Sequence, residues 1–262
     1  MSSPLVIAID GPSGSGKSSV SREVARRLGL AYLDTGAMYR AVCWAVLDAG
    51  IDAAADPAAV TTLTRGLDLQ LSTDPAVAGV RVGGSDVTEA VREPRISAAV
   101  SAVATNLDVR AELRDRQRAI IDQAARGPHA GIVAEGRDIT TVVAPDAQVR
   151  VLLTASEGAR LARRALEVHG SADAEAIAAT RDAVVRRDAD DATVSSFHTA
   201  ADGVVHLDSS HLSFEQTIAA VLDVVADVVG QGRPLNLAAA ALLGPPDPTV
   251  VDLASTGAGT SA

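Results

Sequence analysis

The sequence contains few aromatic residues, one cysteine and one lysine. With aromatic residues at 2% of the chain, alanine, valine, leucine and isoleucine must supply the hydrophobic core of what we expect to be a packed α/β protein. The single cysteine, Cys43, excludes an internal disulfide and is consistent with a reducing compartment. It lies in the apolar run 41–47, which indicates a small buried side chain rather than a reactive thiol.

The chain also lacks a positive net charge and long apolar segments. Its net charge of −10 argues against non-specific binding to nucleic acid polymers or to anionic membranes. The first apolar run, residues 5–9, is too short for a signal sequence or a membrane span, and no basic segment precedes it. We therefore expect a cytoplasmic protein without nucleic acid or membrane partners, in which a local group of arginines can still hold phosphates.

Short apolar runs alternate with helical patterns along the chain. Core strands are predicted at residues 5–9, 31–33, 131–134, 149–153 and 203–207. Helices are predicted at residues 17–28, 36–47, 94–104 and 106–125. Gly29 would cap the first helix, and Asn106 and Asp108 would separate the last two. The pattern predicts an α/β fold, in which helices on both sides form three layers with a mainly parallel five-stranded sheet.

Two segments fall outside this pattern. Residues 67–71 and 77–82 alternate like strands and precede Gly83 and Gly84, which predicts a small antiparallel insert at about residues 65–92. Residues 232–262 are dominated by proline, alanine, glycine, serine and threonine, which predicts a disordered tail.

A phosphate-binding motif stands between the first predicted strand and helix. Residues 11–18 match G-x-x-x-x-G-K-[ST], in which glycines let backbone N–H groups face phosphate oxygens at a helix N-terminus. Lys17 would reach the β- and γ-phosphates, and the Ser18 hydroxyl would ligate Mg²⁺. An ordinary glycine-rich loop is the alternative, and it is weakened because the chain's only lysine stands at the required position. The predicted ATP-binding residues are Gly11, Pro12, Ser13, Gly14, Ser15, Gly16, Lys17, Ser18 and Ser19.

Four further segments accompany this loop. They are D-T-G-A-M-Y-R at residues 34–40, Ser101 with Arg110 nine residues later, E-G-R-D at 135–138 and R-D-x-x-D at 187–191. Together with the loop they resemble the bacterial cytidylate kinases of the nucleoside monophosphate kinase family, over roughly residues 5–230. The resemblance implies a P-loop kinase domain at residues 1–231, with an acceptor-binding insert and a lid at about residues 172–201. It further implies a monomer that uses Mg²⁺ and transfers the γ-phosphoryl group of ATP to CMP, and to dCMP.

The resemblance also implies which residues bind the acceptor nucleotide. They are Thr35 and Arg40 at the phosphate and sugar, Ser101, Arg110 and Asp138 at the cytosine, and Asp191 at the ribose. Asp138 can accept a hydrogen bond from the cytosine amino group, while Arg110 donates to its acceptor atoms. Uracil has a carbonyl oxygen in place of that amino group. The contact of this oxygen with the Asp138 carboxylate would disfavour uracil. Ser101 and Arg110 can converge only if the helix breaks between them.

Catalysis would depend on positive charge around the transferred phosphoryl group, which the resemblance assigns to Lys17, Arg137 and Arg187. Arginine is suited to this task by its planar, bidentate fork. The attacking phosphate oxygen is already ionised at neutral pH, so the reaction needs positioning and charge rather than a general base.

Two positions depart from the family pattern. Val194 stands where an arginine is usual, and the loss of that phosphate contact would cost about 1.5–3 kcal/mol unless Arg186 replaces it. Thr140 stands where a glycine is usual, and a positive φ would strain a β-branched residue there. Three nearby arginines lack the family spacing and are interpreted as solvated: Arg114, Arg116 and Arg118.

Two alternative functions stay open. The chain could phosphorylate another small acceptor, such as a different nucleoside monophosphate. It could also be a nucleotide-binding regulator that has lost turnover through the changes in the lid, although Arg137, Arg187 and Asp191 argue against this. A GTPase is excluded, because its guanine-binding [NT]-K-x-D segment needs a second lysine.

Overall fold

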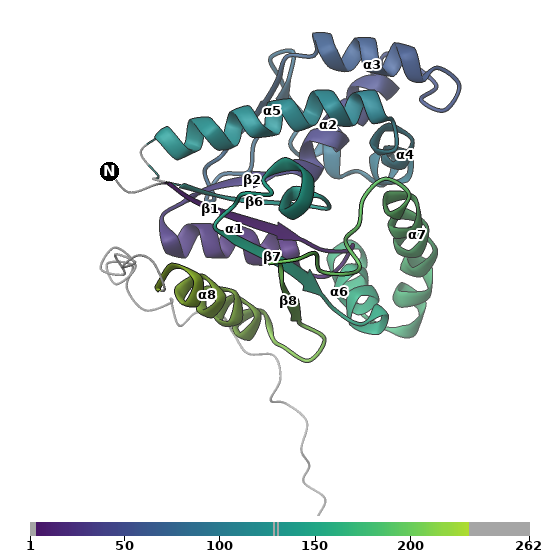
Figure 1. Ribbon diagram of the computed structural model, residues 1–262. Helices are drawn as coiled ribbons and strands as arrows, with labels where there is room; N and C mark the ends of the chain where they lie inside the picture. The colour runs from purple at the N-terminus through teal and green to yellow at the C-terminus, as the bar shows by residue number, and fades with distance from the viewer. Residues whose placement is uncertain (1–3, 128, 130, 231–262) are drawn as a thin grey trace, which may run out of the picture.

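The computed structural model describes residues 4–127, 129 and 131–230, and within these residues five parallel strands form one sheet between layers of helices (Figure 1). The strand order is β2-β6-β1-β7-β8, which puts β1 in the centre. The strands are β1 Leu5–Asp10, β2 Ala31–Asp34, β6 Gly131–Gly136, β7 Val149–Thr154 and β8 Val205–Asp208. The predicted parallel sheet is confirmed, with the last strand shifted two residues from the predicted start at residue 203.

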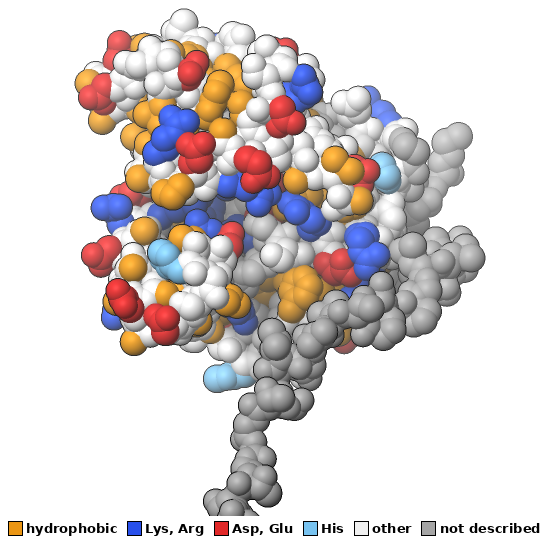
Figure 2. Space-filling view, turned by 180° about the vertical axis from the view of Figure 1, so that it is seen from behind, with side chains coloured by type: hydrophobic (Ala, Val, Ile, Leu, Met, Phe, Trp, Pro, Cys, Tyr) orange, Lys and Arg blue, Asp and Glu red, His pale blue; other side chains and the backbone are white. Residues whose placement is uncertain are grey.

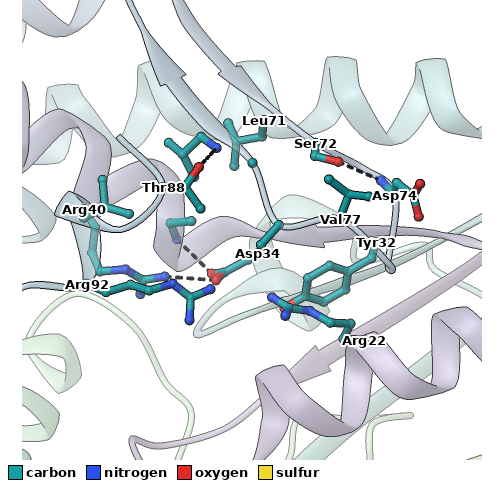
Figure 3. Close-up of a pocket in the computed structure, with 15 residues that line it drawn as sticks. Arg22, Tyr32, Asp34, Arg40, Leu71, Ser72, Asp74, Val77, Thr88 and Arg92 are labelled. Carbon is teal, nitrogen blue, oxygen red and sulfur yellow. Dashed lines mark hydrogen bonds and ion pairs between the residues drawn. The ribbon is translucent and has the colours of Figure 1, made fainter. Parts of the chain in front are cut away.

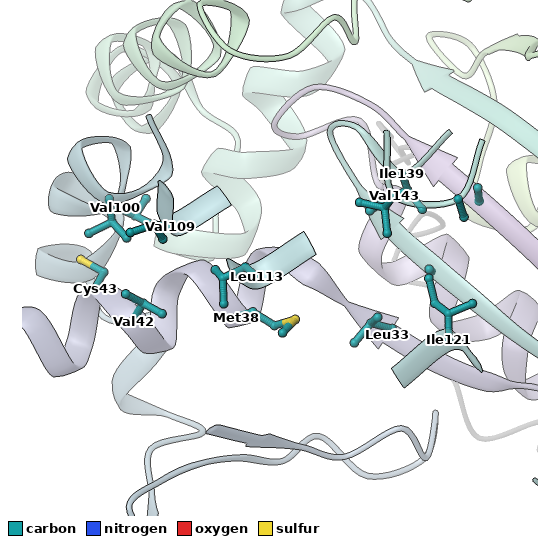
Figure 4. Packing of buried hydrophobic residues seen from close by; sticks show 14 of the residues in the cluster. Leu33, Met38, Val42, Cys43, Val100, Val109, Leu113, Ile121, Ile139 and Val143 are labelled. Atoms are coloured by element: carbon teal, nitrogen blue, oxygen red, sulfur yellow. The ribbon is translucent and has the colours of Figure 1, made fainter. Parts of the chain in front are cut away.

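Helices cover both faces of the sheet. One face packs against α2 (Thr35–Asp48) and α5 (Leu107–Arg126), and α4 (Pro94–Ala104) packs on these two helices. Figure 4 shows Leu33 of β2 near Met38 of α2, and Val100 of α4 beside Cys43 of α2. The other face packs against α1 (Lys17–Leu28) and α8 (Phe214–Gly230). The strands alternate accordingly, because Ala8 faces the first layer while Ile7 and Ile9 face the second. This arrangement confirms the predicted three layers.

A small antiparallel sheet stands between α3 (Pro57–Gly66) and α4. It consists of β3 Leu69–Leu71, β4 Val80–Val82 and β5 Ser85–Asp86, and a short helix η1, Ala90–Arg92, follows it. Gly83 and Gly84 make the turn between β4 and β5 with φ of 55° and 82°, which favour glycine. Both strands predicted here are shorter than expected, and Val77 is exposed instead of paired. The buried valines of this sheet pack on α2.

Asn106 separates α4 from α5. Its side-chain oxygen accepts the N–H groups of Asp108 and Val109 at 3.1 and 3.3 Å. Its amide also donates to the Pro57 carbonyl at 2.9 Å, which ties the break to α3. The predicted break is therefore confirmed, with Asn106 as the cap and Asp108 in the first turn of α5.

Two helices lie beyond the carboxyl ends of the strands (Figure 1). They are α6, Glu157–His169, and α7, Ala174–Ala192, which pack against each other, and α7 also contacts α4. None of the helices in the described part of the chain combines the length and apolar character needed to span a bilayer. The tail predicted for residues 232–262 lies outside the described residues.

Candidate functional site

The phosphate-binding loop joins the end of β1 to the start of α1. Gly14 has φ of 73°, and a Cβ at this position would lie 2.5 Å from the backbone oxygen of Arg160. Gly16 has φ of 87° and precedes the first helical residue, Lys17. The loop therefore needs glycine for its conformation and for its contact with α6, and it leaves the N-terminus of α1 beside the loop's N–H groups.

Residues from α6 and α7 support this loop. Arg160 donates to the Ser13 carbonyl at 2.8 Å, and Arg163 donates to the Ser15 carbonyl at 3.1 Å. From α7, the Asp188 carboxylate accepts the Ser13 N–H at 3.0 Å and also pairs with Arg160. None of these three supporting side chains was predicted as a site residue from the sequence. Asp188 stood in the R-D-x-x-D segment, and the three-residue spacing of Arg160 and Arg163 places both on one face of α6.

Positive side chains gather beside the loop. Burial, followed by the charges of Arg137 and Arg187, lowers the pKa of Lys17 to about 8. Burial, followed by Arg137 and Arg40, lowers the pKa of Arg187 to about 10. Among the described residues, the buried Nε of Arg187 has no hydrogen-bond partner. Figure 2 shows Lys and Arg side chains along a hollow that crosses one face of the molecule. The group therefore combines closely spaced positive charges with an unused donor, which suit an anion.

Arg137 joins the strand layer to α7. Its Nε donates to Asp191 at 2.9 Å, and its Nη2 pairs with Asp188 at 3.3 Å. The guanidinium also lies 4.7 Å from the centre of the Phe197 ring. Arg187 is 3.9 Å from the same Asp191 carboxylate, one turn along the helix. The structure thus brings together Arg137, Arg187 and Asp191, three residues to which the resemblance assigns contacts with the nucleotides.

Two carboxylates lie under the start of α1. Glu135 accepts the Ser18 hydroxyl at 2.7 Å, and burial, followed by the charge of Asp34, raises the pKa of Glu135 to about 7. Asp34 caps α2 and pairs with Arg40 at 2.9 Å. Burial alone would raise the pKa of Asp34, but Arg40 and the Ala37 N–H hold it below its ordinary value. Neither carboxylate was predicted as a site residue from the sequence.

These oxygen atoms suit a divalent cation held together with phosphates. Hydroxyl and carboxylate oxygens are the donors that Mg²⁺ prefers, and a cation would relieve the repulsion that raises the pKa of Glu135. In the part of the chain that the structure describes, no three His, Cys, Asp or Glu side chains form a metal-binding group. The residues present therefore fit a metal that keeps water and phosphate ligands, with Ser18 as the nearest protein donor.

Arg110 and Asp138 form an ion pair at the other end of the site. Arg110 also donates to the Ala104 carbonyl at 3.1 Å, and its guanidinium lies 5.8 Å from the centre of the Tyr39 ring. Both members of the pair are largely shielded from solvent, with side chains 14% and 13% exposed. Burial raises the pKa of Asp138, and Arg110 opposes that shift. The pair therefore offers a carboxylate acceptor and a guanidinium donor side by side.

A pocket lies between the small antiparallel sheet on one side and β2, α1 and α2 on the other. It holds about 440 Å³, part of it open to solvent. Figure 3 shows Asp34 and Arg40 on its wall, with Arg92 close by and with Arg22 over the Tyr32 ring. The pocket is thus continuous with the group of charges at Arg40.

Comparison with known proteins agrees with this geometry. A family model described as cytidylate kinase matches residues 7–227. The chain belongs to the cytidylate kinase family. It is 52% identical over 223 residues to a cytidylate kinase of Cutibacterium acnes, covering 85% of this chain and 96% of that one. It is 46% identical over 233 residues to one of Rhodococcus opacus, covering 88% and 99%, and 42% identical over 224 residues to one of Streptomyces avermitilis, covering 85% and 93%.

One acceptor residue predicted from the cytidylate kinase resemblance is engaged elsewhere. The Thr35 hydroxyl donates to the Glu135 carbonyl at 2.8 Å, and the residue is 3% exposed. In this arrangement Thr35 holds the β2–α2 junction against β6. Ser101 is half-buried on α4, on the helix whose end contacts Arg110.

The departures from the cytidylate kinase pattern have different outcomes. Thr140 lies in a π-helical turn, η2, Ile139–Val143, so the strain that a positive φ would have caused at this position does not arise. Arg186 is exposed on α7, which gives no support for its replacing an arginine at position 194. Val194 is half-buried, three residues beyond Asp191.

Two of the arginines interpreted as solvated are instead structural. Arg116 donates to the Leu67 and Thr64 carbonyls at 2.8 and 2.9 Å, and Arg118 donates to the Val143 carbonyl at 3.0 Å. The first ties α5 to the end of α3, and the second ties α5 to η2. Their long side chains donate to backbone carbonyl groups at the ends of these helical segments.

Proposed function

We propose that this chain transfers the γ-phosphoryl group of ATP to CMP, and to dCMP, forming ADP with CDP or dCDP. The observation that carries this proposal is the position of the closely spaced positive charges and of one unused donor among them. The buried, unpartnered Nε of Arg187 lies in a cationic group that includes Lys17 and Arg137. Arg137 and Asp138, adjacent in sequence, connect this group to the Arg110–Asp138 pair. A phosphate acceptor bound to that pair would extend toward the cationic group.

ATP would occupy the phosphate loop. Lys17 would give up its present hydrogen bond to the Pro12 carbonyl, at 3.4 Å, and bind the β- and γ-phosphates. The Ser18 hydroxyl would turn from Glu135 to Mg²⁺, which neutralises phosphate charge when it is bound. Negative phosphates beside Lys17 would raise its pKa again, so the bound state keeps the lysine charged.

The acceptor base would enter between Arg110 and Asp138. In the free protein these two side chains satisfy each other, which keeps a buried charge from standing unpaired. Cytosine can replace both partners, because its amino group donates to Asp138 while its N3 and O2 accept from Arg110. The Tyr39 ring beside Arg110 offers an aromatic face on which the base can stack. Asp191 would bind the ribose, and Arg40 the acceptor phosphate.

The transfer itself would use charge and position. An oxygen of the acceptor phosphate forms a bond to the γ-phosphorus, and the bond from that phosphorus to the β–γ bridging oxygen breaks. Lys17, Arg137 and Arg187 stabilise the negative charge that is spread over the phosphoryl oxygens. The attacking oxygen of the acceptor phosphate is already ionised at neutral pH, so no proton has to be removed from it.

The kinase domain would span residues 1–231 and contain two movable parts. The insert, about residues 65–92, would close on the acceptor, as the shared pocket with Asp34 and Arg40 supports. The lid, about residues 172–201, includes α7 and would bring Arg187 and Asp191 to the nucleotides.

The test is ADP formation with Mg-ATP and CMP, dCMP, UMP, AMP or GMP in parallel. We expect CMP and dCMP to be phosphorylated fastest, and Asp138→Asn to lose most of that preference. Asp146→Asn, the same change at an exposed position, is the matched control. Faster turnover of another monophosphate would contradict the cytosine assignment. No turnover, with ATP binding that is lost in Lys17→Ala, would favour the nucleotide-binding alternative that Val194 suggests.

A further inference from the structure

One buried carboxylate outside the proposed nucleotide contacts holds the turn that follows Arg137 and Asp138. Asp10 is the last residue of β1 and is 1% exposed. Its Oδ1 accepts the Ile139 N–H at 2.9 Å, and its Oδ2 accepts the Thr140 N–H at 2.8 Å. The Thr140 hydroxyl donates to the same Oδ2 at 2.6 Å. These hydrogen bonds tie the end of β1 to the two residues after Asp138.

The bonds replace a cap that Asp138 does not provide. Asp138 immediately precedes η2, where an aspartate side chain commonly accepts the first free N–H groups of a helical turn. Within the described chain its carboxylate makes no such capping bond and pairs with Arg110 instead. Because Asp10 accepts the free N–H groups, the Asp138 carboxylate stays available to the proposed base site.

The same junction has a second connection. Arg137 donates to the carbonyl of Gly11, the residue after Asp10. Asp10 also lies opposite Gly136 in the parallel pairing of β1 with β6. The start of the phosphate loop and the segment with Arg137 and Asp138 are therefore held in one fixed relation.

We propose that Asp10 is a positioning residue, which holds Arg137 and Asp138 against the phosphate loop through Ile139 and Thr140. The inference rests on the proposed function, because Asp138 is the residue assigned to the cytosine amino group. The Thr140 hydroxyl adds a donor at a position where glycine is usual in the family. Removing this hydroxyl frees the turn and moves Asp138, so acceptor selection suffers more than ATP binding.

The charge on Asp10 supplies an independent readout. Burial raises the pKa of Asp10 to about 6, the Thr140 hydrogen bonds lower it, and the charge of Asp138 raises it. A protonated carboxyl is a poorer acceptor, so activity falls as the pH drops through this range. Losing the Thr140 hydroxyl raises the pKa of Asp10, and the fall then begins at higher pH. The other charged groups at this junction are Asp138, Arg137 at the Gly11 carbonyl, Arg150 of β7 at the Thr140 carbonyl and Arg118 of α5 at the Val143 carbonyl.

The test compares three variants of the full chain. Thr140→Val removes the hydroxyl with little change in shape, Thr140→Ser keeps it, and Thr141→Val makes the same change at the next position as a matched control. In Thr140→Val we expect about a tenfold or greater loss of kcat/KM for CMP, as a hydrogen bond to a charged group implies. The preference for CMP over UMP falls, and KM for ATP stays within about twofold of the parent's value. In the plot of activity against pH, the decrease on the acidic side (the acidic limb) moves to higher pH. Thr140→Ser and Thr141→Val keep the parent's values within about twofold.

Hydrogen exchange of the ligand-free proteins tests the same contact without turnover. The amides of Ile139 and Thr140 should exchange faster in Thr140→Val than in Thr140→Ser. Unchanged kinetics, acidic limb and exchange in Thr140→Val would overturn the proposal. Asp10→Asn keeps only one acceptor oxygen at this position. A smaller loss of kcat/KM for CMP in Asp10→Asn than in Thr140→Val would also overturn the proposal. If the parent protein does not phosphorylate CMP, the proposed function fails, while the exchange comparison still decides whether Asp10 holds the turn.

Discussion

The Asp188 carboxylate on α7 accepts a hydrogen bond from the backbone N–H of Ser13 in the phosphate loop, at 3.0 Å. The carboxylate also pairs with Arg137 and Arg160, and its side chain is 7% exposed. One acidic side chain from the proposed lid thus fixes the loop backbone and one of the arginines assigned to the phosphates. A movement of α7 would therefore change the support of the loop.

Replacing Asp188 with asparagine should weaken both ATP binding and the fold. The change keeps the shape but leaves two largely buried guanidinium groups without their shared counter-ion. We expect KM for ATP to rise by about tenfold and the free energy of unfolding to fall by about 1–3 kcal/mol. Steady-state kinetics and urea unfolding measure the two effects. Asp182→Asn, at an exposed position on the same helix, should change neither. Equal values for Asp188→Asn and the parent would show that this contact is dispensable.

ATP affinity should decrease as the pH rises through about 8, where Lys17 loses its proton in the free protein. Titration calorimetry between pH 7 and about 9.5 would measure the decrease, and Lys17→Met should abolish most of the affinity together with its pH dependence. An affinity that stays constant over this range would contradict the assigned role of Lys17.

The same group affects the stability of the ligand-free protein. The pKa of Lys17 is lowered from 10.5 to about 8 on folding, so the unfolded chain binds the extra proton between these values. The contribution of Lys17 to the free energy of unfolding therefore rises with pH across that window. Comparing thermal unfolding of the parent with Lys17→Met isolates this contribution from those of other groups.

Local patterns were sufficient to predict the layers and the phosphate loop. The apolar runs at β1, β6 and β7 are bounded by glycine, proline or helical segments, and the loop motif depends on neighbouring residues only. The break at Asn106 was predictable for the same reason, because a cap acts within one turn.

Contacts between distant segments were not predictable. Asp188 meets Ser13 across 175 residues, and Ser18 meets Glu135 across 117 residues. The buried position of Thr35 and the backbone contacts of Arg116 likewise depend on how helices pack on the sheet. A single sequence specifies that these residues are polar, but the packing determines which polar group each one meets.

Cys43 should resist alkylation in the folded protein. The residue is buried in the core, and burial raises the pKa of its thiol to about 11. Since the thiolate is the reactive form, iodoacetamide at pH 8 should label the unfolded chain and leave the folded chain largely unlabelled. Mass spectrometry of both samples provides the comparison. Rapid labelling under native conditions would mean that α2 and α4 separate readily around this residue.

Replacing Val194 with arginine should accelerate the reaction. Position 194 lies just beyond α7, where its N–H donates to the Asp191 carbonyl at 3.2 Å, so it is at the end of the helix that carries Arg187 and Asp191. A charged donor reaching a phosphate contributes about 1.5–3 kcal/mol, which corresponds to about tenfold or more in kcat/KM. Coupled-assay kinetics with saturating Mg-ATP measure the gain.

Val185→Arg is the matched control for this prediction, because Val185 is exposed on α7 and an added charge there lies on the solvent side. It should leave kcat/KM unchanged, which separates a specific phosphate contact from a general increase in positive charge. A gain in Val194→Arg alone would mean that the lid of this chain works with one arginine fewer than it can use. A loss, or an equal gain in both variants, would mean that residue 194 does not approach the phosphates when the lid closes.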